Sequence, residues 1–263
     1  NEASGLAASF LNIGVYFSIN DSGNAPELFA LNANGSHVEV WTIAYSERHD
    51  FEDIEAFGYK GQRYLLLADT GDNFYWRPEV RLLVLVEPEL GQMQDEPLQP
   101  AWVITYRYPD GACDVEAVAV DEKTEKIFLI SKRRVPPELF SLPLRPEQKL
   151  ITAKYESRLM GLSQPSDRDL REDPRYGKYR SAPTALTVKG SKAVLITYRD
   201  AYLYERLRGE SWPEAFAAKP DRIALPDIFG LEAGALHPHK KKLLIVSERE
   251  DGVGRSGVYE VEL

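Results

Sequence analysis

The sequence predicts an all-β fold, a single β-propeller of five blades. Three observations carry this prediction: short β-like segments dominate the chain, a short acidic motif recurs, and similar strands follow each copy. Six blades are the alternative, if residues 116–184 contain a further degenerate blade. We expect residues 1–263 to form one domain, because all-β domains often reach this length.

The predicted strands are rich in Val, Ile, Leu and Tyr, or alternate apolar with polar residues. They span residues 15–19, 27–31, 38–45, 64–69, 80–86, 102–108, 126–131, 138–144, 193–198, 201–205, 242–247 and 257–263. Only residues 209–218 favour a helical turn or two. Residues 160–180 are polar, charged and without periodicity, so we expect an exposed insertion between blades.

The recurring motif joins acidic, apolar and small residues. Its clearest copies are DFEDIEA from Asp50, DVEAVAV from Asp114 and GLEAGAL from Gly230, and weaker copies begin at Ala3 and Ala182. The equivalent positions in the five copies are Ser4, Glu52, Glu116, Thr184 and Glu232.

A second and a third strand follow each copy of the motif. We expect a fourth, outer strand in four units, at residues 38–45, 102–108, 150–155 and 222–225. The last unit ends after its third strand, and a strand from the N-terminus is one way to complete it. Four antiparallel strands repeated radially are the pattern of a β-propeller.

Propeller topology predicts where side chains from distant segments meet. The first strand of each blade lines the channel, and the second strand runs antiparallel to it. The start of the first strand and the end of the second therefore lie at the same face of the propeller. Glu52, Glu116 and Glu232 should therefore converge at one end of the channel. The residues expected around them are Asp21, Asp69, Lys132, Tyr198 and Glu248.

Three glutamates in a narrow channel repel one another, and this raises their pKa values unless a cation or a basic side chain intervenes. Carboxylate oxygens suit a hard cation, Ca²⁺ before Mg²⁺. We predict Glu52, Glu116 and Glu232 as the metal ligands. An equally weighted alternative is a ring without metal, neutralised by Lys132, Arg133, Arg199 and Arg249.

The same face is predicted to bind a ligand. The ligand-binding candidates follow the second strands or lie in the loops after them: Asp21, Asn24, Asp72, Asn73 and Tyr198. The favoured function is binding of a small molecule, peptide or glycan at the channel mouth. The alternative is a metal-dependent hydrolase of a small ester, lactone or phosphoester.

In the hydrolase alternative, Glu248 or Asp69 would be the base, and Lys132 or Arg199 would hold an anion. The sequence shows no complete catalytic constellation, so binding ranks first, and a purely structural role comes third.

Composition excludes some partners. A net charge of −9 argues against a nucleic-acid backbone, and no run approaches the roughly 20 apolar residues of a membrane span. Cys113 is the only cysteine, so no internal disulfide forms. The chain begins at Asn1 rather than Met, which favours a removed export signal and an extracytoplasmic location. We expect a monomer.

Eight motifs resemble a widespread set of bacterial exported β-propeller proteins: NDSG at 20–23, DFEDIE at 50–55, GDN at 71–73, YPDG at 108–111, DVEA at 114–117, SK at 131–132, TYRDAY at 197–202 and LEA at 231–233. More distantly, the chain is similar to calcium-dependent gluconolactonase and paraoxonase propellers. In those families a glutamate that opens a first strand holds a central Ca²⁺ with Asn and Asp side chains.

The distant resemblance implies Glu52, Glu116 and Glu232 as ligands, with Asn24 and Asn73 matched less securely. The chain departs from their pattern in two ways, because those families usually have six blades and Lys132 has no obvious metal-binding role.

Overall fold

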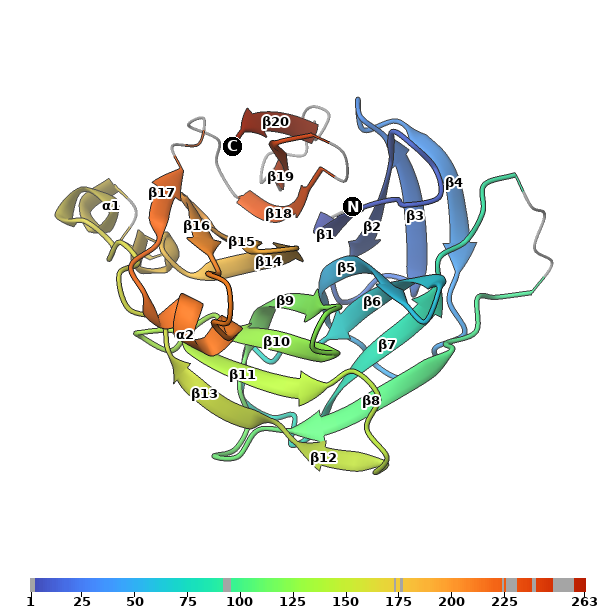
Figure 1. Ribbon diagram of the computed structural model, residues 1–263, viewed down its shortest axis with the longest axis horizontal. Helices are drawn as coiled ribbons and strands as arrows, with labels where there is room; N and C mark the ends of the chain where they lie inside the picture. The colour runs from blue at the N-terminus through green and yellow to red at the C-terminus, as the bar shows by residue number, and fades with distance from the viewer. Residues whose placement is uncertain are drawn as a thin grey trace.

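The computed structural model describes residues 3–91, 96–172, 174–175, 177–223, 225, 231–237, 240–247 and 258–263. Its strands form five small sheets around a central axis, as Figure 1 shows. The fold is all-β, a five-bladed β-propeller, so the predicted class is confirmed. Residues 116–184 form no sixth sheet within the described ranges.

In every blade the strand nearest the axis comes first in the chain, and the others follow outward. Blade 1 consists of β1 (Ala3–Ala8), β2 (Val15–Asn20), β3 (Glu27–Asn32) and β4 (His37–Thr42). Blade 2 consists of β5 (Phe51–Tyr59), β6 (Gln62–Asp69), β7 (Val80–Val86), β8 (Trp102–Arg107) and the short β12 (Leu150–Thr152). Blade 3 consists of β9 (Val115–Asp121), β10 (Lys126–Ser131), β11 (Glu138–Pro143) and β13 (Lys154–Arg158).

Blade 4 consists of β14 (Pro183–Lys189), β15 (Lys192–Thr197), β16 (Ala201–Glu205) and β17 (Asp221–Ile223). Blade 5 consists of β18 (Leu231–Leu236), β19 (Lys242–Ser247) and β20 (Val258–Glu262). The innermost strands contact their neighbours in a closed circle, β1–β5–β9–β14–β18 and back to β1. The N-terminal strand therefore opens blade 1 and lies beside blade 5 without completing that sheet (Figure 1).

Each innermost strand carries a β-bulge at the same place. In blade 2, for example, Phe51 pairs with Asp69 and Asp53 pairs with Ala68, which leaves Glu52 as the extra residue. The five extra residues are Ser4, Glu52, Glu116, Thr184 and Glu232. These are the positions that the sequence repeat aligned, so the alignment is confirmed. A bulge takes its extra residue out of the ladder and re-aims the side chain.

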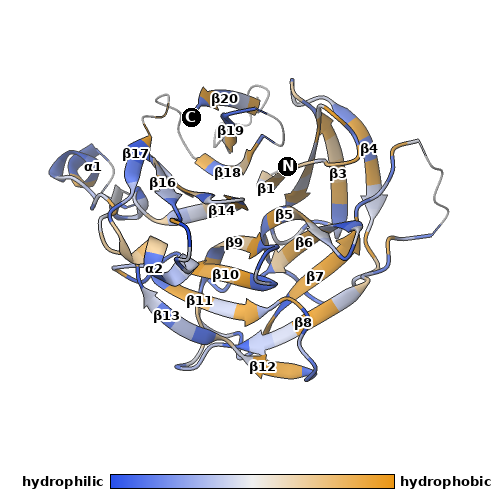
Figure 2. Cartoon of the chain, in the orientation of Figure 1, coloured by the Kyte–Doolittle hydropathy of each residue, from blue (hydrophilic) through white to orange (hydrophobic). Residues whose placement is uncertain are grey.

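The core lies between the blades rather than in one central mass. The described residues form five apolar clusters, and each cluster joins two neighbouring blades. Phe17 and Leu67, for example, belong to the cluster between blades 1 and 2. Figure 2 shows apolar residues concentrated on middle strands such as β7 and β10. Each fully buried Leu or Phe contributes about 2 kcal/mol, so these interfaces fix where the innermost strands meet.

The outer edge of blade 3 differs from the prediction. Residues 150–155 were expected to form one outer strand, and this is wrong. β12 pairs in parallel with β8 of blade 2, whereas β13 pairs with β11 of blade 3. Ala153, between them, is buried and donates its N–H to Arg107 O at 2.8 Å. The chain thus crosses from one blade to the next at that residue.

The helical segments lie away from the axis. α1 (Asp167–Glu172) and the 3₁₀ helix η1 (Gly177–Tyr179) fall within the predicted insertion, and α1 lies at the rim in Figure 1. α2 (Trp212–Ala217) falls within the helical segment predicted at 209–218. Among the described helices, none has the length and apolar character needed to cross a membrane.

Candidate functional site

Two of the three predicted metal ligands lie together. Glu52 and Glu116, with Asp114, each offer a carboxylate oxygen within 4.8 Å of the others. Glu116 is 3% exposed and Asp114 is 1% exposed. The third predicted ligand, Glu232, is half-buried on β18 and is in neither carboxylate group found among the described residues. Its charge nevertheless raises the pKa values of Lys132 and Tyr198.

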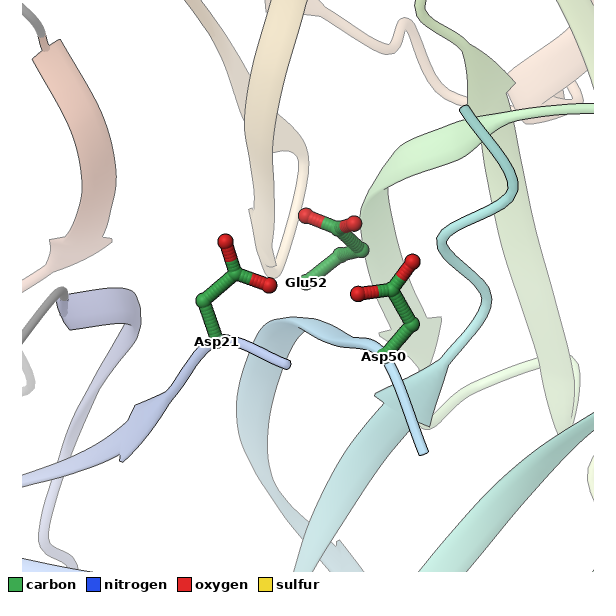
Figure 3. Close-up of side chains that lie close together, drawn as sticks. All are labelled: Asp21, Asp50 and Glu52. Atoms are coloured by element: carbon green, nitrogen blue, oxygen red, sulfur yellow. The ribbon is translucent and has the colours of Figure 1, made fainter. Parts of the chain in front are cut away.

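A second carboxylate group shares Glu52. Asp21 follows β2 of blade 1, Asp50 directly precedes β5 of blade 2, and their ligand oxygens lie within 4.8 Å of each other and of Glu52. Figure 3 shows the three carboxyl groups turned toward one another. The group is assembled by the contact of two neighbouring blades, and Glu52 connects it to the group that contains Glu116.

The carboxyl groups hold their protons more tightly than usual. Burial raises the pKa of Asp50 to about 6, and the charge of Asp21 adds to this. Burial also raises the pKa of Glu52 well above its usual range, with repulsion from Glu116 second. Burial raises the pKa of Glu116 to about 7, although the Lys132 ammonium opposes the shift. Any cation placed between these groups would relieve both desolvation and repulsion.

The two carboxylate groups, which share Glu52, are together called the ring. Lys132 places a fixed positive charge beside it. Its ammonium forms an ion pair with Glu116 and lies 5.0 Å from the centroid of the Tyr198 ring. Burial alone would lower the pKa of Lys132, but Glu116, Tyr198 and Glu232 raise it well above its usual value. Lys132 therefore stays protonated and neutralises one carboxylate of the ring, as the metal-free alternative expected of it.

Gly71 leaves room for the second carboxylate group. A Cβ atom added there would overlap Glu52 Oε1 and lie 2.5 Å from Asp50 Oδ2. The backbone N–H of Gly71 donates to Asp50 O at 3.2 Å, which holds the loop against the start of β5. The glycine of the GDN motif thus permits the close approach of backbone to carboxylates.

Asp69, a candidate base, is fully buried, and both of its oxygens accept hydrogen bonds. Tyr45 Oη donates to Oδ2 at 2.6 Å, and Asp50 N and Arg77 Nη2 donate to Oδ1 at 2.9 and 2.7 Å. These bonds fix the start of β5, so Asp69 positions Asp50 for the site.

Asp72 organises the loop that follows β6. It accepts the backbone N–H groups of Trp76 and Arg77 at 2.8 and 3.0 Å. Asn73 is exposed, and its side-chain carbonyl accepts from Arg133. On the other side of the ring, exposed Asn24 donates to the backbone oxygen of Asp21 at 3.1 Å. Each asparagine thus contacts a residue next to the carboxylates, and its role in ligand binding stays a prediction.

Tyr198 and Arg199 follow β15 but make different contacts. Tyr198 faces Lys132, as described above. Arg199 forms ion pairs with Asp169 of α1 and with Asp200, at 3.4 Å for the second pair. Arg199 therefore ties the insertion to blade 4. The remaining candidate base, Glu248, lies outside the described residues.

Sequence reasoning missed three acidic residues. Asp50 and Asp114 each precede a bulge glutamate by two positions, in the Asp-x-Glu that both copies of the motif share. That spacing was a usable signal for both. Asp53 is 1% exposed and accepts the N–H groups of Val118 at 2.8 Å and Leu186 at 3.3 Å. It links the innermost strands of blades 2, 3 and 4, which no local pattern indicates.

Thr184 occupies the same bulge position in blade 4. It is 1% exposed, and its Oγ1 atom has no hydrogen-bond partner among the described residues. A buried hydroxyl without a partner loses its hydration without compensation. The bulge position of blade 4 therefore carries a buried hydroxyl in place of a carboxylate.

Comparisons with known proteins agree with the fold. No family model and no curated protein matches the sequence. A solved structure of a luciferin-regenerating enzyme is similar over 99% of this chain and 78% of its own, with a TM-score of 0.50 and 12% identity. A chain of a nidogen/laminin complex is similar over 93% of this chain and 72% of its own, with a TM-score of 0.49 and 12% identity. At this identity the likeness to the enzyme supports the β-propeller fold alone.

Proposed function

We propose that this propeller is a binding protein that holds a divalent cation between Asp21, Asp50 and Glu52 and presents it to a ligand at the channel mouth. The observation that carries the proposal is the convergence of these three carboxylates from two blades within 4.8 Å. Loss of hydration and the charges of nearby acids raise the pKa values of half-buried Asp50 and of Glu52. Within the described residues none of the three carboxylates forms an ion pair, so a bound cation would supply the balancing charge.

Ca²⁺ fits this donor set better than Mg²⁺. All the donors are oxygens, and two of the three carboxylates come from loop or strand-end positions where the geometry is irregular. Ca²⁺ accepts irregular oxygen shells, whereas Mg²⁺ requires a near-ideal octahedron. A side chain at position 71 would displace Glu52 or Asp50, so the glycine is needed for this donor set whichever ion it holds.

The second carboxylate group is less suited to a cation. Glu116 is paired with Lys132, and Asp114 accepts from Arg133 Nε at 2.7 Å. The metal set predicted from the sequence, Glu52 with Glu116 and Glu232, therefore changes to one that retains Glu52 alone. Lys132 and Arg133 neutralise Glu116 and Asp114. The other group, Asp21, Asp50 and Glu52, is then the one that binds the ion.

Binding is supported better than the hydrolase alternative. Both oxygens of Asp69 already accept hydrogen bonds, and Arg199 is held by Asp169. Of the catalytic candidates in the described ranges, Lys132 alone lies at the ring. If the protein hydrolysed simple esters or lactones only in the presence of a cation, the hydrolase function would rank above binding.

The test is titration calorimetry of the chelator-treated protein with Ca²⁺, Mg²⁺ and Mn²⁺. We expect Ca²⁺ to bind most tightly and E52Q to weaken it at least about a hundredfold, because Glu52 is the buried member of the group. The matched control is E147Q, which removes an exposed glutamate from the β11–β12 loop. Equal Ca²⁺ binding by E52Q and E147Q would overturn the proposal.

A further inference from the structure

Beside the ring lies a cavity of about 430 Å³ whose charge is opposite to that of the ring. Its walls include Tyr75, Lys132, Arg133, Arg134, Lys178 and Tyr179. Four of these side chains are cationic, and none of the described residues that line the cavity is acidic. We call it the basic cavity. Its volume lies in the range of small-molecule sites, about 300 to 1,000 Å³.

The insertion builds one side of the basic cavity. Residues 162, 164, 165, 178 and 179 of the insertion supply that wall, together with residues 181 and 182, which follow it. The loop after β10 supplies the opposite wall, and Tyr75 comes from the loop after β6. Ion pairing of Arg199 with Asp169 and Asp200 holds the insertion on blade 4. The segment that the sequence marked only as an exposed loop thus has a place in a built concave surface.

Acids behind the walls hold the two arginines in place. Arg133 Nε donates to Asp114 at 2.7 Å, and Arg134 Nη1 donates to Asp110 at 2.7 Å and also to Glu138. A guanidinium has five N–H donors, so these bonds orient each group and leave N–H donors for another partner. Preorganised donors lose little entropy when an anion binds.

Lys178 carries the charge that is not balanced. It is exposed, its ammonium lies 4.8 Å from the centroid of the Tyr179 ring, and it forms no ion pair within the described residues. The Oγ atom of Ser181, which also lines the cavity, is buried without a hydrogen-bond partner in the described part of the chain. The cavity thus offers an exposed cation that no described acid pairs with.

Aromatic rings supply flat walls. The Arg133 guanidinium lies 5.1 Å from the centroid of Tyr179, so this ring packs beside two cations. Tyr75 is 47% exposed and has a φ of 58°, a left-handed conformation that is costly for a tyrosine. Its N–H donates to Asp72 O at 3.0 Å, which holds the ring at the cavity wall. Flat rings beside fixed cations favour a planar anion.

We infer that the basic cavity binds a small organic oxyanion, a carboxylate or a phosphate attached to a planar group. The anionic end contacts the arginines and Lys178, and the planar part packs on Tyr75 and Tyr179. The site is separate from the proposed cation site, although Lys132 belongs to both the ring and the cavity wall. Binding does not require the cation, so the two proposals fail or succeed independently.

The probes are 1-naphthoate and 1-naphthyl phosphate, with uncharged 1-naphthol as the control ligand, titrated calorimetrically in chelator and at low salt. We expect both anions to bind more tightly than 1-naphthol, and added salt to weaken them. A preference for one anion identifies the charged group. Equal affinity for 1-naphthol and the anions, or no heat with either anion, would overturn the inference.

The variants are K178E and K123E, which make the same charge change at two exposed lysines. Lys123 lies in the β9–β10 turn, at the end of β9 opposite Glu116. We expect K178E to weaken both anions about tenfold and K178Q to weaken them less. K123E should leave both affinities within about twofold, because Lys123 is remote from the cavity. Equal losses in K178E and K123E would contradict a site at Lys178.

Discussion

The ammonium of Lys132 pairs with Glu116 at the bulge of β9 and lies 5.0 Å from the Tyr198 ring. One lysine thus supplies the balancing charge for a buried glutamate in a ring that also contains Glu52. The acids on the other side of Glu52, Asp21 and Asp50, do not share that ion pair. The ring is therefore asymmetric in charge, and this asymmetry generates the predictions that follow.

Without a divalent cation, the free energy of unfolding should fall as pH rises from about 5 to about 8. The folded state raises the pKa of Asp50 to about 6 and that of Glu116 to about 7. It therefore binds more protons than the unfolded chain in this window, and stability is lost as they dissociate. The shift at Glu116 alone corresponds to a loss on the order of 3 kcal/mol. Urea unfolding in chelator, followed by circular dichroism, measures it.

Saturating Ca²⁺ should flatten this dependence, because the ion stabilises the deprotonated carboxylates. E116Q is the control, since it removes one titrating group and should reduce the slope. A stability that rises between these pH values in chelator would refute the assignment of raised pKa values.

K132M should destabilise the protein and strengthen cation binding. Removal of the ammonium leaves Glu116 buried without its partner, which costs about 3 kcal/mol near pH 8 and less at pH 6, where Glu116 is protonated. Loss of a nearby positive charge should tighten Ca²⁺ about tenfold. Urea unfolding and calorimetry measure the two effects. K132M/E116Q should recover part of the stability; no recovery would show that Lys132 acts by packing alone.

G71A should weaken Ca²⁺ binding and reduce stability together. The added methyl would overlap Glu52 and crowd Asp50, so one of these carboxylates must leave its position. The predicted cost is about 1 to 3 kcal/mol, typical of overpacking. In an E52A background the same change should cost less, because the carboxylate that it displaces is gone. Equal costs in both backgrounds, measured by urea unfolding, would rule out the proposed contact.

D53A should destabilise the propeller without altering the cation site directly. Asp53 accepts the N–H groups of Ile54, Val118 and Leu186, and its loss removes the acceptor of three buried donors. We expect a cost of about 3 kcal/mol, and a smaller one for D53N, which keeps one acceptor oxygen. Chemical unfolding measures both variants. A cost for D53A below that of an exposed change such as E147A would remove Asp53 from this bridging role.

The sequence predicts the positions of strands and bulges better than it predicts which partners the individual side chains contact. The strands at 80–86, 126–131, 201–205 and 242–247 match β7, β10, β16 and β19 residue for residue, because buried apolar runs between turns are a local signal. The five bulge positions emerged from the repeat for a similar reason. The break at Ala153 was missed, because the pairing of β12 with another blade is not local.

In the candidate site, too, local features were predicted and non-local contacts were missed. Topology placed Glu52, Glu116 and Glu232 together, with Lys132 and Asp21 around them. Glu52 lies near both Glu116 and Asp21, and Lys132 pairs with Glu116, whereas Glu232 is in neither carboxylate group of the described residues. Spacing could not show that Asp69 and Arg199 are engaged by Tyr45, Arg77 and Asp169, since those partners are set by tertiary contacts. The basic cavity was invisible for the same reason, because its walls come from three segments distant in the chain.

In each innermost strand, the β-bulge frees one residue from the constraints of strand pairing. Because that residue takes no part in backbone pairing, the five positions can differ, and here they carry a hydroxyl at Ser4 and Thr184 and a carboxyl at the other three. Related chains with this architecture could exchange one functional group for another at these places and keep the same scaffold. The five bulge positions are thus the places where a substitution could change the bound ion or ligand without disturbing the sheets.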